Sequence, residues 1–376
     1  RYLPAVLDRF LDRPGLIRRV TARAMDTDPK TLGRLTVSML KGADGNQRKE
    51  VGVMCRWLES VAPEAILFSN LLVGGSIPEI RRRIDVPVIV TLQGDDVFLD
   101  SLQPPYRQQS LDQIRNIVPS VDGFIVHTEF FRQYMSEYFN IPLERIFVTP
   151  LGLAVGEFRS IRRSHQAGRT IGYLARLAPE KGLHLLVEAF IKLKSMPGYD
   201  DVRLRVSGWL GPPNEKYAQL QWDRLRDAGL ENDYEYLGSI DRAGKLEFLA
   251  AIDLLSVPAT YLEPKALYAL EALAAGVPVV GPDRGAFPEL AADTGGIELF
   301  PAGDADALAG KLSDLLANEP RRNDLGQHGR TSVFDRRNAA AMASAADPPA
   351  PKRPKVDSPA VGAKAAEPAS AKASTP

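Results

Sequence analysis

Short apolar segments rich in β-branched residues alternate with helix-like stretches along most of the chain, and this alternation restricts the fold more than any other feature. Such segments are typical of strands that are buried on both faces of a parallel sheet covered by helices. The strands expected in the first half are residues 65–69, 86–92, 122–128 and 145–152. Those expected in the second half are residues 170–175, 202–208, 234–238, 253–258 and 277–281. We therefore expect an α/β fold with parallel sheets.

The stretches between these strands have helical periodicity. The expected helices are residues 76–84, 128–139, 181–194, 214–228, 242–251 and 264–275. Apolar periodicity is lost over residues 155–169, which we interpret as a linker. The sequence thus predicts two Rossmann-like domains facing a cleft, with the ligand at the carboxyl ends of the strands. We place the N-terminal domain at residues 1–157 and the C-terminal domain at residues 158–340.

The two ends of the chain differ from this body. Residues 1–25 have the pattern of an amphipathic helix broken at Pro14, and basic residues outnumber acidic ones up to Lys41. This pattern fits a peripheral contact with a membrane surface or a docked helix with a solvated basic face. Residues 341–376 are expected to form a disordered tail rich in Ala, Pro and Lys, because they lack the apolar side chains of a core.

The composition excludes several classes of protein. The chain has 376 residues, 44% of them apolar, so it can form sizeable cores. Because 47 basic residues balance 47 acidic ones, no overall charge favours nucleic acid. Cys55 is the only cysteine, which makes a reducing, cytoplasmic setting the expectation, and no apolar run is long enough to span a membrane. The four histidines have no metal-ligand spacing, and we interpret them as structural or surface residues.

Residues 263–276 read EPKALYALEALAAG and place two carboxylates, Glu263 and Glu271, around one expected helix. Pro264 suits the first turn of this helix, and Gly276 suits its end. Eight residues of helix separate the carboxylates by about 12 Å, enough for contacts with two sugar rings and phosphates between them. The alternative is that Glu263 only caps the helix and Glu271 is solvated.

The start of this helix is expected to face the cleft, because it follows the strand at residues 253–258. Backbone N–H groups of Lys265, Ala266 and Leu267 would then point at an anion, helped by the helix dipole. The Lys265 side chain either adds a cation to that site or lies at the surface.

Residues 172–190, GYLARLAPEKGLHLLVEAF, combine a strand, a loop with two cations and a helix that starts near Gly182. Arg176 and Lys181 would lie at the carboxyl end of the first strand of the C-terminal domain. There they could neutralise a diphosphate, Arg as a planar fork and Lys as a point charge. The alternative is a pair of ordinary surface charges.

With these motifs the sequence resembles the family 4 glycosyltransferases, retaining enzymes with the GT-B fold. The resemblance covers roughly residues 60–340. It is strongest over residues 170–290, where ARLAPEKG, the two glutamates at 263 and 271, and AAGVPVVGPDRGAFPEL occur in order. It implies the transfer of a sugar from a nucleotide-diphosphate donor to an acceptor, with retained configuration and without a metal or other cofactor.

The resemblance also implies roles for the residues of the C-terminal domain. As catalytic residues, Arg176 and Lys181 would hold the pyrophosphate and stabilise the leaving group, and Glu263 would face the donor sugar at the reaction centre. The donor-binding residues implied in addition are Glu271 for the ribose hydroxyls, the backbone around Ala266 and Leu267 for phosphate, and Lys265 and Gly172.

In the N-terminal domain, residues 86–99, VPVIVTLQGDDVFL, resemble the family's strand and cleft loop. The family often has a histidine where this chain has Gln93, which can form hydrogen bonds but cannot act as an acid or base near neutral pH. Gln93, Gly94, Asp95 and Asp96 are therefore expected on the acceptor side of the cleft, with an aspartate as the nearer acceptor contact. The alternative is an ordinary loop that caps the following segment.

The start of the chain departs from the family. The family's glycine-rich loop after its first strand has no counterpart, and the first clear strand is at residue 65. The chain opens with Arg1, so we expect a fragment or a processed product. This departure leaves a degenerate protein that binds nucleotide sugars without turnover as an alternative.

The expected partners are a UDP- or GDP-sugar donor and a saccharide, lipid-linked or small-molecule acceptor. The chain would act in the cytoplasm, with peripheral contact at the inner membrane face as an option. Another GT-B enzyme, such as a nucleotide-sugar epimerase, is a further alternative, whereas a glucan phosphorylase would need a cofactor-lysine arrangement that we do not find. A glycosidase is disfavoured because its two carboxyls lie roughly 5–10 Å apart in a water-accessible groove.

Overall fold

The computed structural model describes residues 29–161 and 169–345. The expected helix at residues 1–25 lies outside the described residues, as does part of the expected linker. The tail expected from residue 341 begins inside a helix that ends at Ala345, and residues 346–376 lie outside the described part.

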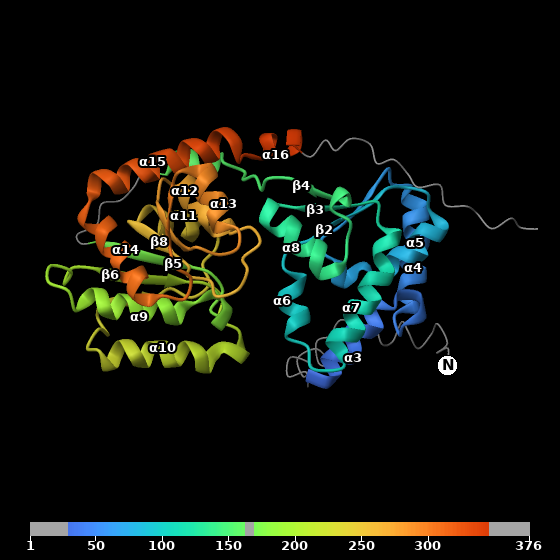
Figure 1. The fold of residues 1–376 in the computed structure, drawn as a ribbon, viewed down its shortest axis with the longest axis horizontal. Helices are drawn as coiled ribbons and strands as arrows, with labels where there is room; N and C mark the ends of the chain where they lie inside the picture. The colour runs from blue at the N-terminus through green and yellow to red at the C-terminus, as the bar shows by residue number, and fades with distance from the viewer. Residues whose placement is uncertain (1–28, 162–168, 346–376) are drawn as a thin grey trace, which may run out of the picture.

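Two parallel β-sheets form the centres of two α/β units, which lie side by side (Figure 1). The strands of the N-terminal sheet are β1 (Ile66–Phe68), β2 (Val88–Thr91), β3 (Gly123–Val126) and β4 (Ile146–Val148). Those of the C-terminal sheet are β5 (Thr170–Leu174), β6 (Arg203–Ser207), β7 (Tyr234–Tyr236), β8 (Leu254–Ser256), β9 (Val279–Pro282) and β10 (Ile297–Phe300). The predicted two-domain α/β fold is confirmed, with each predicted strand shortened at its ends except at β9, which extends one residue further.

The strand order places a switch point in the C-terminal sheet. The N-terminal order is β1-β2-β3-β4, whereas the C-terminal order is β10-β9-β8-β5-β6-β7. From β5 the chain first adds β6 and β7 on one side and then returns to add β8 on the other. Loops after β5 and β8 therefore diverge at the carboxyl edge, which is where open parallel sheets bind ligands.

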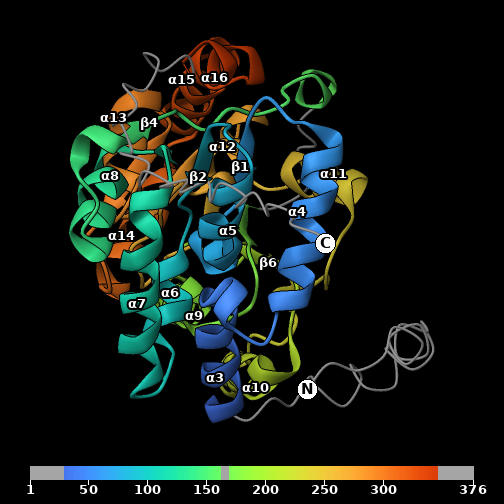
Figure 2. The same cartoon turned by 90° about the vertical axis from the view of Figure 1, so that its right-hand side faces the viewer.

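Helices cover the faces of both sheets. Those of the N-terminal unit are α3 (Pro29–Leu40), α4 (Arg48–Val61), α5 (Ile77–Arg83), α6 (Asp95–Asp100), α7 (Tyr106–Ile117) and α8 (Glu129–Phe139). Those of the C-terminal unit are α9 (Leu183–Lys194), α10 (Glu215–Asp227), α11 (Arg242–Ala250), α12 (Leu267–Ala274), α13 (Phe287–Thr294), α14 (Ala305–Ala317), α15 (Glu319–Arg336) and α16 (Ala339–Ala345). A view from the N-terminal unit shows α3 and α4 on its outer side (Figure 2).

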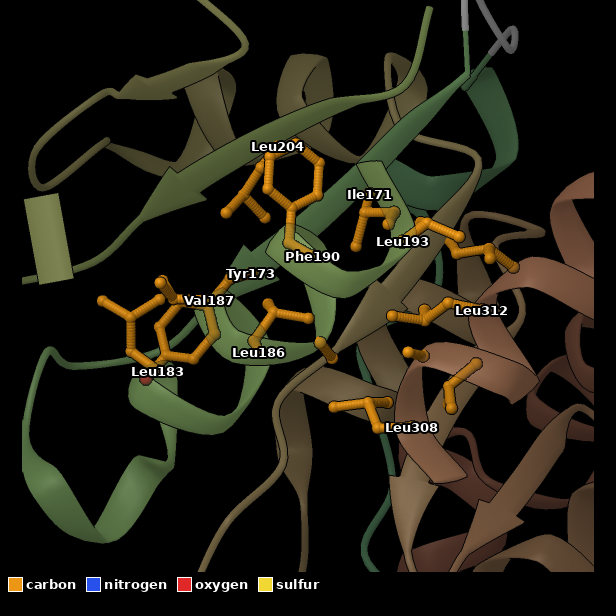
Figure 3. Packing of buried hydrophobic residues seen from close by; sticks show 14 of the residues in the cluster. Ile171, Tyr173, Leu183, Leu186, Val187, Phe190, Leu193, Leu204, Leu308 and Leu312 are labelled. Atoms are coloured by element: carbon orange, nitrogen blue, oxygen red, sulfur yellow. The ribbon is translucent and has the colours of Figure 1, made fainter. Parts of the chain in front are cut away.

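Each face of the C-terminal sheet has its own apolar core. On one face, Ile171 and Tyr173 of β5 pack with Phe190 of α9 and Leu312 of α14 (Figure 3). On the other face, α11 and α12 cover the sheet. Continuous burial of all five residues of β5 explains why this strand reads as an apolar run in the sequence.

The last helices return to the segment that joins the two units. Leu153 pairs with Asn338 in an isolated bridge, and its N–H donates to the carbonyl of Arg337. Helix α16 follows directly and extends toward the N-terminal unit (Figure 1). The crossing from one unit to the other is therefore braced by the end of α15.

Several elements differ from the expectations. The helix predicted at residues 264–275 begins at Leu267, because Ala266 has a left-handed backbone with φ 44°. Pro264 therefore lies before the helix and not in its first turn. Strand β10 was missed because its IELF segment is short and contains Glu298, which pairs with Lys311 and Arg321. In the described part of the chain no helix is long and apolar enough to cross a membrane.

Candidate functional site

The two loops at the switch point bring the predicted motifs together. The loop after β5 carries Arg176 and Lys181, and the loop after β8 carries Tyr261 and Glu263. Nζ of Lys181 lies 2.7 Å from Oε2 of Glu263, although the residues are 82 positions apart. The structure therefore places both motifs at one edge of the sheet, as predicted.

Glu263 is buried and accepts hydrogen bonds from four donors. Oε2 accepts from Lys181, from the hydroxyl of Tyr261 at 2.6 Å and from the hydroxyl of Tyr268 at 3.1 Å. Oε1 accepts from the backbone N–H of Ala266 at 3.2 Å. Burial alone would raise the pKa of Glu263, but Lys181 and the other donors outweigh it and hold the pKa below its usual value. The carboxylate is thus ionised, and a donor sugar must exchange with one of these partners to reach it.

Lys181 is surrounded by groups that favour a cation. Its Nζ also donates to the Tyr261 hydroxyl at 2.6 Å and lies 4.7 Å from the centre of the Tyr261 ring and 5.4 Å from that of Tyr268. The two tyrosines were not singled out from the sequence. The residue type alone does not indicate that the tyrosine hydroxyls reach a carboxylate, although Tyr261 lies two residues from Glu263.

Gly285 makes room for the backbone that carries Glu263. A Cβ at this position would lie 2.7 Å from the Glu263 nitrogen, and the φ of 63° is left-handed. The neighbouring N–H of Ala286 donates to the Glu263 carbonyl at 2.8 Å. The loop after β9 therefore fixes the loop after β8.

Arg176 differs from Lys181 because it is exposed. It pairs with Glu180, four residues later, while 45% of its side chain remains accessible. A surface pair of this kind is weak, so the guanidinium can turn toward an incoming anion at little cost.

The start of α12 offers fewer free N–H groups than expected. The N–H of Ala266 is already bonded to Glu263. Leu267 is the first helical residue, and its side chain is exposed. Of the three backbone N–H groups that were expected to bind an anion, the one of Ala266 is therefore already used within the chain.

Two other predicted donor-binding residues have partners inside the domain. Glu271 pairs with Lys245 of α11 through Oε1 and Nζ, 2.5 Å apart. Lys245 was missed because it lies in a different motif. Gly172 lies within β5, where a Cβ would meet Ile252 at 2.4 Å and Phe248 at 3.1 Å. The structure therefore gives Gly172 a packing role beneath α11.

The predicted acceptor-side residues follow β2. Gly94 has a left-handed φ of 110°, and Nε2 of Gln93 donates to the Ser69 carbonyl at 2.7 Å. Asp95 is buried and accepts from the N–H of Leu71 at 2.8 Å, which ties the loop to the segment after β1. Burial raises the pKa of Asp95, although the backbone hydrogen bonds from Gln93 and Leu71 act to lower it.

Asp96 is buried as well, but one of its oxygens is not used. Among the described residues Oδ1 has no hydrogen-bond partner. Burial, and then the charges of Asp95 and Asp100, raise the pKa of Asp96 to about 6. Asp96 also contributes to raising the pKa of Tyr261, which lies in the other domain. Asp96 therefore lies near the junction of the two units.

Hydrogen bonds join the segments that follow β2 and β3 to the C-terminal unit. Nζ of Lys265 donates to Oε1 of Gln93, and the Thr128 hydroxyl donates to the Pro264 carbonyl at 3.2 Å. The N–H of Phe130 donates to the Glu289 carboxylate at 3.2 Å. The segment between Glu263 and α12 thus lies against the ends of β2 and β3.

His127 is buried, with Nδ1 2.9 Å from the Thr149 carbonyl, which is compatible with the structural role expected of the histidines. It follows β3 directly, and Lys265 contributes to its electrostatic environment. Among the described residues no group of three or more His, Cys, Asp or Glu side chains could hold a metal ion.

This arrangement, two Rossmann-like units with the ligand edge of one facing the other, is the GT-B fold, and solved structures share it. Sucrose-phosphate synthase from Thermosynechococcus elongatus aligns with a TM-score of 0.66 and 21% identity, covering 79% of this chain and 75% of that one. HepE from Anabaena, solved in complex with UDP and glucose, aligns with a TM-score of 0.68 and 18% identity, covering 80% and 81%.

Residues 156–332, which include most of the C-terminal unit, match the family model described as glycosyl transferases group 1. A phosphatidyl-myo-inositol mannosyltransferase from Mycobacterium leprae is 34% identical over 44% of this chain and 42% of its own length. A D-inositol 3-phosphate glycosyltransferase from Mycolicibacterium smegmatis is 29% identical over 59% and 50%. The chain therefore spans about half the length of the curated relatives it matches.

Proposed function

We propose that the chain transfers a sugar from a nucleotide-diphosphate donor to an acceptor, with retention of configuration. The observation that carries this proposal is the meeting of Arg176, Lys181 and Glu263 at the switch point of the C-terminal sheet. The names of the group 1 relatives support sugar transfer, and the HepE complex with UDP and glucose supports a nucleotide donor.

In this reaction the Arg176 and Lys181 cations bind the donor diphosphate and stabilise the charge that develops on it as the sugar leaves. These cations take the place of a metal or other cofactor in the proposal. The backbone N–H groups at Lys265 and Leu267 add donors at the start of α12. Glu271 exchanges Lys245 for the ribose hydroxyls, and Glu263 exchanges a tyrosine for the sugar.

The acceptor enters from the N-terminal unit in this proposal. The loop from Gln93 to Asp96 lies at that side, and the unpartnered Oδ1 of Asp96 is a free acceptor for a substrate hydroxyl. The acceptor is a saccharide, a lipid-linked sugar or a small molecule. With one cysteine in the chain, the cytoplasm is the setting we propose.

Calorimetric titration of UDP and GDP into the purified chain tests the donor site. We expect one nucleotide to bind, and Arg176→Ala to weaken binding at least about tenfold, because charge-assisted hydrogen bonds are worth about 1.5–3 kcal/mol. Lys311→Met, on α14, is the matched control and should bind like the parent chain. Failure of both nucleotides to bind would refute the proposal.

A further inference from the structure

The side chain of Lys265 crosses from one unit to the other. Its backbone lies in the C-terminal unit, between Glu263 and α12, but its ammonium donates to Oε1 of Gln93 in the N-terminal unit. Gln93 is held in place because its Nε2 donates to the Ser69 carbonyl. The ammonium is therefore placed against the loop after β2, on the acceptor side of the cleft.

This ammonium lacks a matching negative charge. Over the described ranges 29–161 and 169–345, the polar contact found for Nζ is the neutral amide oxygen of Gln93. Burial lowers the pKa of the Lys265 ammonium, Lys181 acts in the same direction, and Glu263 opposes both. Glu263 is already bonded to Lys181 and two tyrosines. A half-buried cation in such surroundings is costly until an anion joins it.

His127, directly after β3, lies near Lys265 and Arg337. Nδ1 of His127 is 2.9 Å from the Thr149 carbonyl. Burial lowers the pKa of its imidazole, and the two charged groups that add to this effect, Lys265 and Arg337, are both cations. Nη1 of Arg337 is buried without a hydrogen-bond partner in the part of the chain that the structure describes. Arg337 is itself paired with Asp293 at 2.8 Å, so Lys265 is the cation near His127 for which the described residues show no carboxylate hydrogen bond.

We propose that Lys265 and Gln93 form a subsite for an anionic group, a phosphate or a carboxylate, carried by the acceptor. The inference rests on the proposed function, in which the acceptor is the second substrate. The acceptor is favoured over the donor as the source because Gln93 and His127 follow strands of the N-terminal sheet. The anion replaces the Gln93 oxygen on the ammonium and also receives the Gln93 amide N–H.

The test is a calorimetric titration of inorganic phosphate into the full chain saturated with UDP or GDP, whichever binds. The nucleotide occupies the diphosphate site, so phosphate reports a second site. We expect Lys265→Met to weaken phosphate binding at least about tenfold, the size of one charge-assisted contact. Lys265→Arg should retain it, because the cation remains. Lys311→Met, which removes a remote lysine, should leave it unchanged.

The outcomes separate this inference from the proposed function. If a nucleotide binds but phosphate does not, or binds equally to Lys265→Met, the subsite is refuted and the donor site stands. If neither nucleotide binds, both proposals fail. Binding of UDP-glucuronate and UDP-glucose identifies the source of the anion. A preference for UDP-glucuronate that Lys265→Met removes would assign the anion to the donor sugar and overturn the acceptor subsite.

Discussion

Nζ of Lys181 donates to the carboxylate of Glu263 over 2.7 Å, and the two side chains are only 15% and 5% exposed. This pair links the loop after β5 to the loop after β8 at the switch point. A buried ion pair need not stabilise a fold, but breaking one by removing a single partner leaves an uncompensated charge. A variant that removes the charge of one partner therefore changes the stability of the fold as well as the site.

Lys181→Met should destabilise the chain by about 3 kcal/mol, because Glu263 keeps its tyrosine partners but loses the cation that neutralises it. The double variant Lys181→Met with Glu263→Gln should recover part of this loss, since no buried charge remains. Urea unfolding at pH 7 measures both. Lys311→Met, whose ion pair with Glu298 is more exposed, should cost less than about 1 kcal/mol. Strictly additive losses in the double variant would show that the two residues are not coupled.

Glu263→Gln should spare the binding of the bare nucleotide and abolish sugar transfer. The amide keeps the shape of the side chain but loses the charge that we propose acts on the donor sugar. Nucleotide affinity is measured by calorimetry, and transfer by release of nucleoside diphosphate in the presence of acceptor. Transfer close to that of the parent chain would remove Glu263 from the reaction centre.

Gly285→Ala should destabilise the chain by about 2–3 kcal/mol, because the new Cβ meets the Glu263 backbone in addition to the left-handed strain. Gly303→Ala is the matched control, since it has a left-handed φ of 86° with nothing within 4 Å of its Cβ. It should cost only about 1 kcal/mol. Thermal or urea unfolding compares the two. Equal losses would mean that the contact with Glu263 is relieved without cost.

The sequence was sufficient to predict the two sheets and the placement of Lys181 and Glu263 at the ends of neighbouring strands, but not the ion pair between them. Apolar strands follow from burial on both faces, and the carboxyl ends of neighbouring parallel strands must share an edge. The partners within that edge were not predictable, because Tyr268 reaches Glu263 only through the left-handed turn at Ala266. An alanine gives no sign of such a turn, for which glycine is the usual residue.

Contacts between the units were equally hidden. Gln93 was noted as a departure from the family and Lys265 as a candidate cation, but nothing in their local sequence indicates that one bonds to the other across 172 positions. Their contact depends on how the two sheets are placed, which is set by the crossing at Leu153 and the end of α15. Local patterns therefore predicted the units but not their junction.

The raised pKa of Asp96 gives a prediction about pH. Its pKa is raised from 3.8 to about 6 in the folded chain, because burial disfavours the ionised carboxylate. When folding raises the pKa of a carboxyl, the folded chain is more stable with that carboxyl protonated than with it ionised. The contribution of Asp96 to the free energy of unfolding is therefore most favourable below about pH 4, where the carboxyl is protonated. It becomes less favourable as the pH rises to about 6. At neutral pH the folded chain bears the full cost of an ionised Asp96.

Asp96→Asn removes this titration. Because the pKa of Asp96 is shifted by about two units, the change in the free energy of unfolding caused by the variant should be about 2–3 kcal/mol more favourable at pH 7 than at pH 4. Urea unfolding of the parent chain and the variant at pH 4, 5, 6 and 7 measures the difference at each pH. Glu231→Gln, in the loop before β7, makes the same change from carboxyl to amide at an exposed position and serves as the control. A stability difference that is constant from pH 4 to 7 would mean that Asp96 ionises as freely in the folded chain as in the unfolded one.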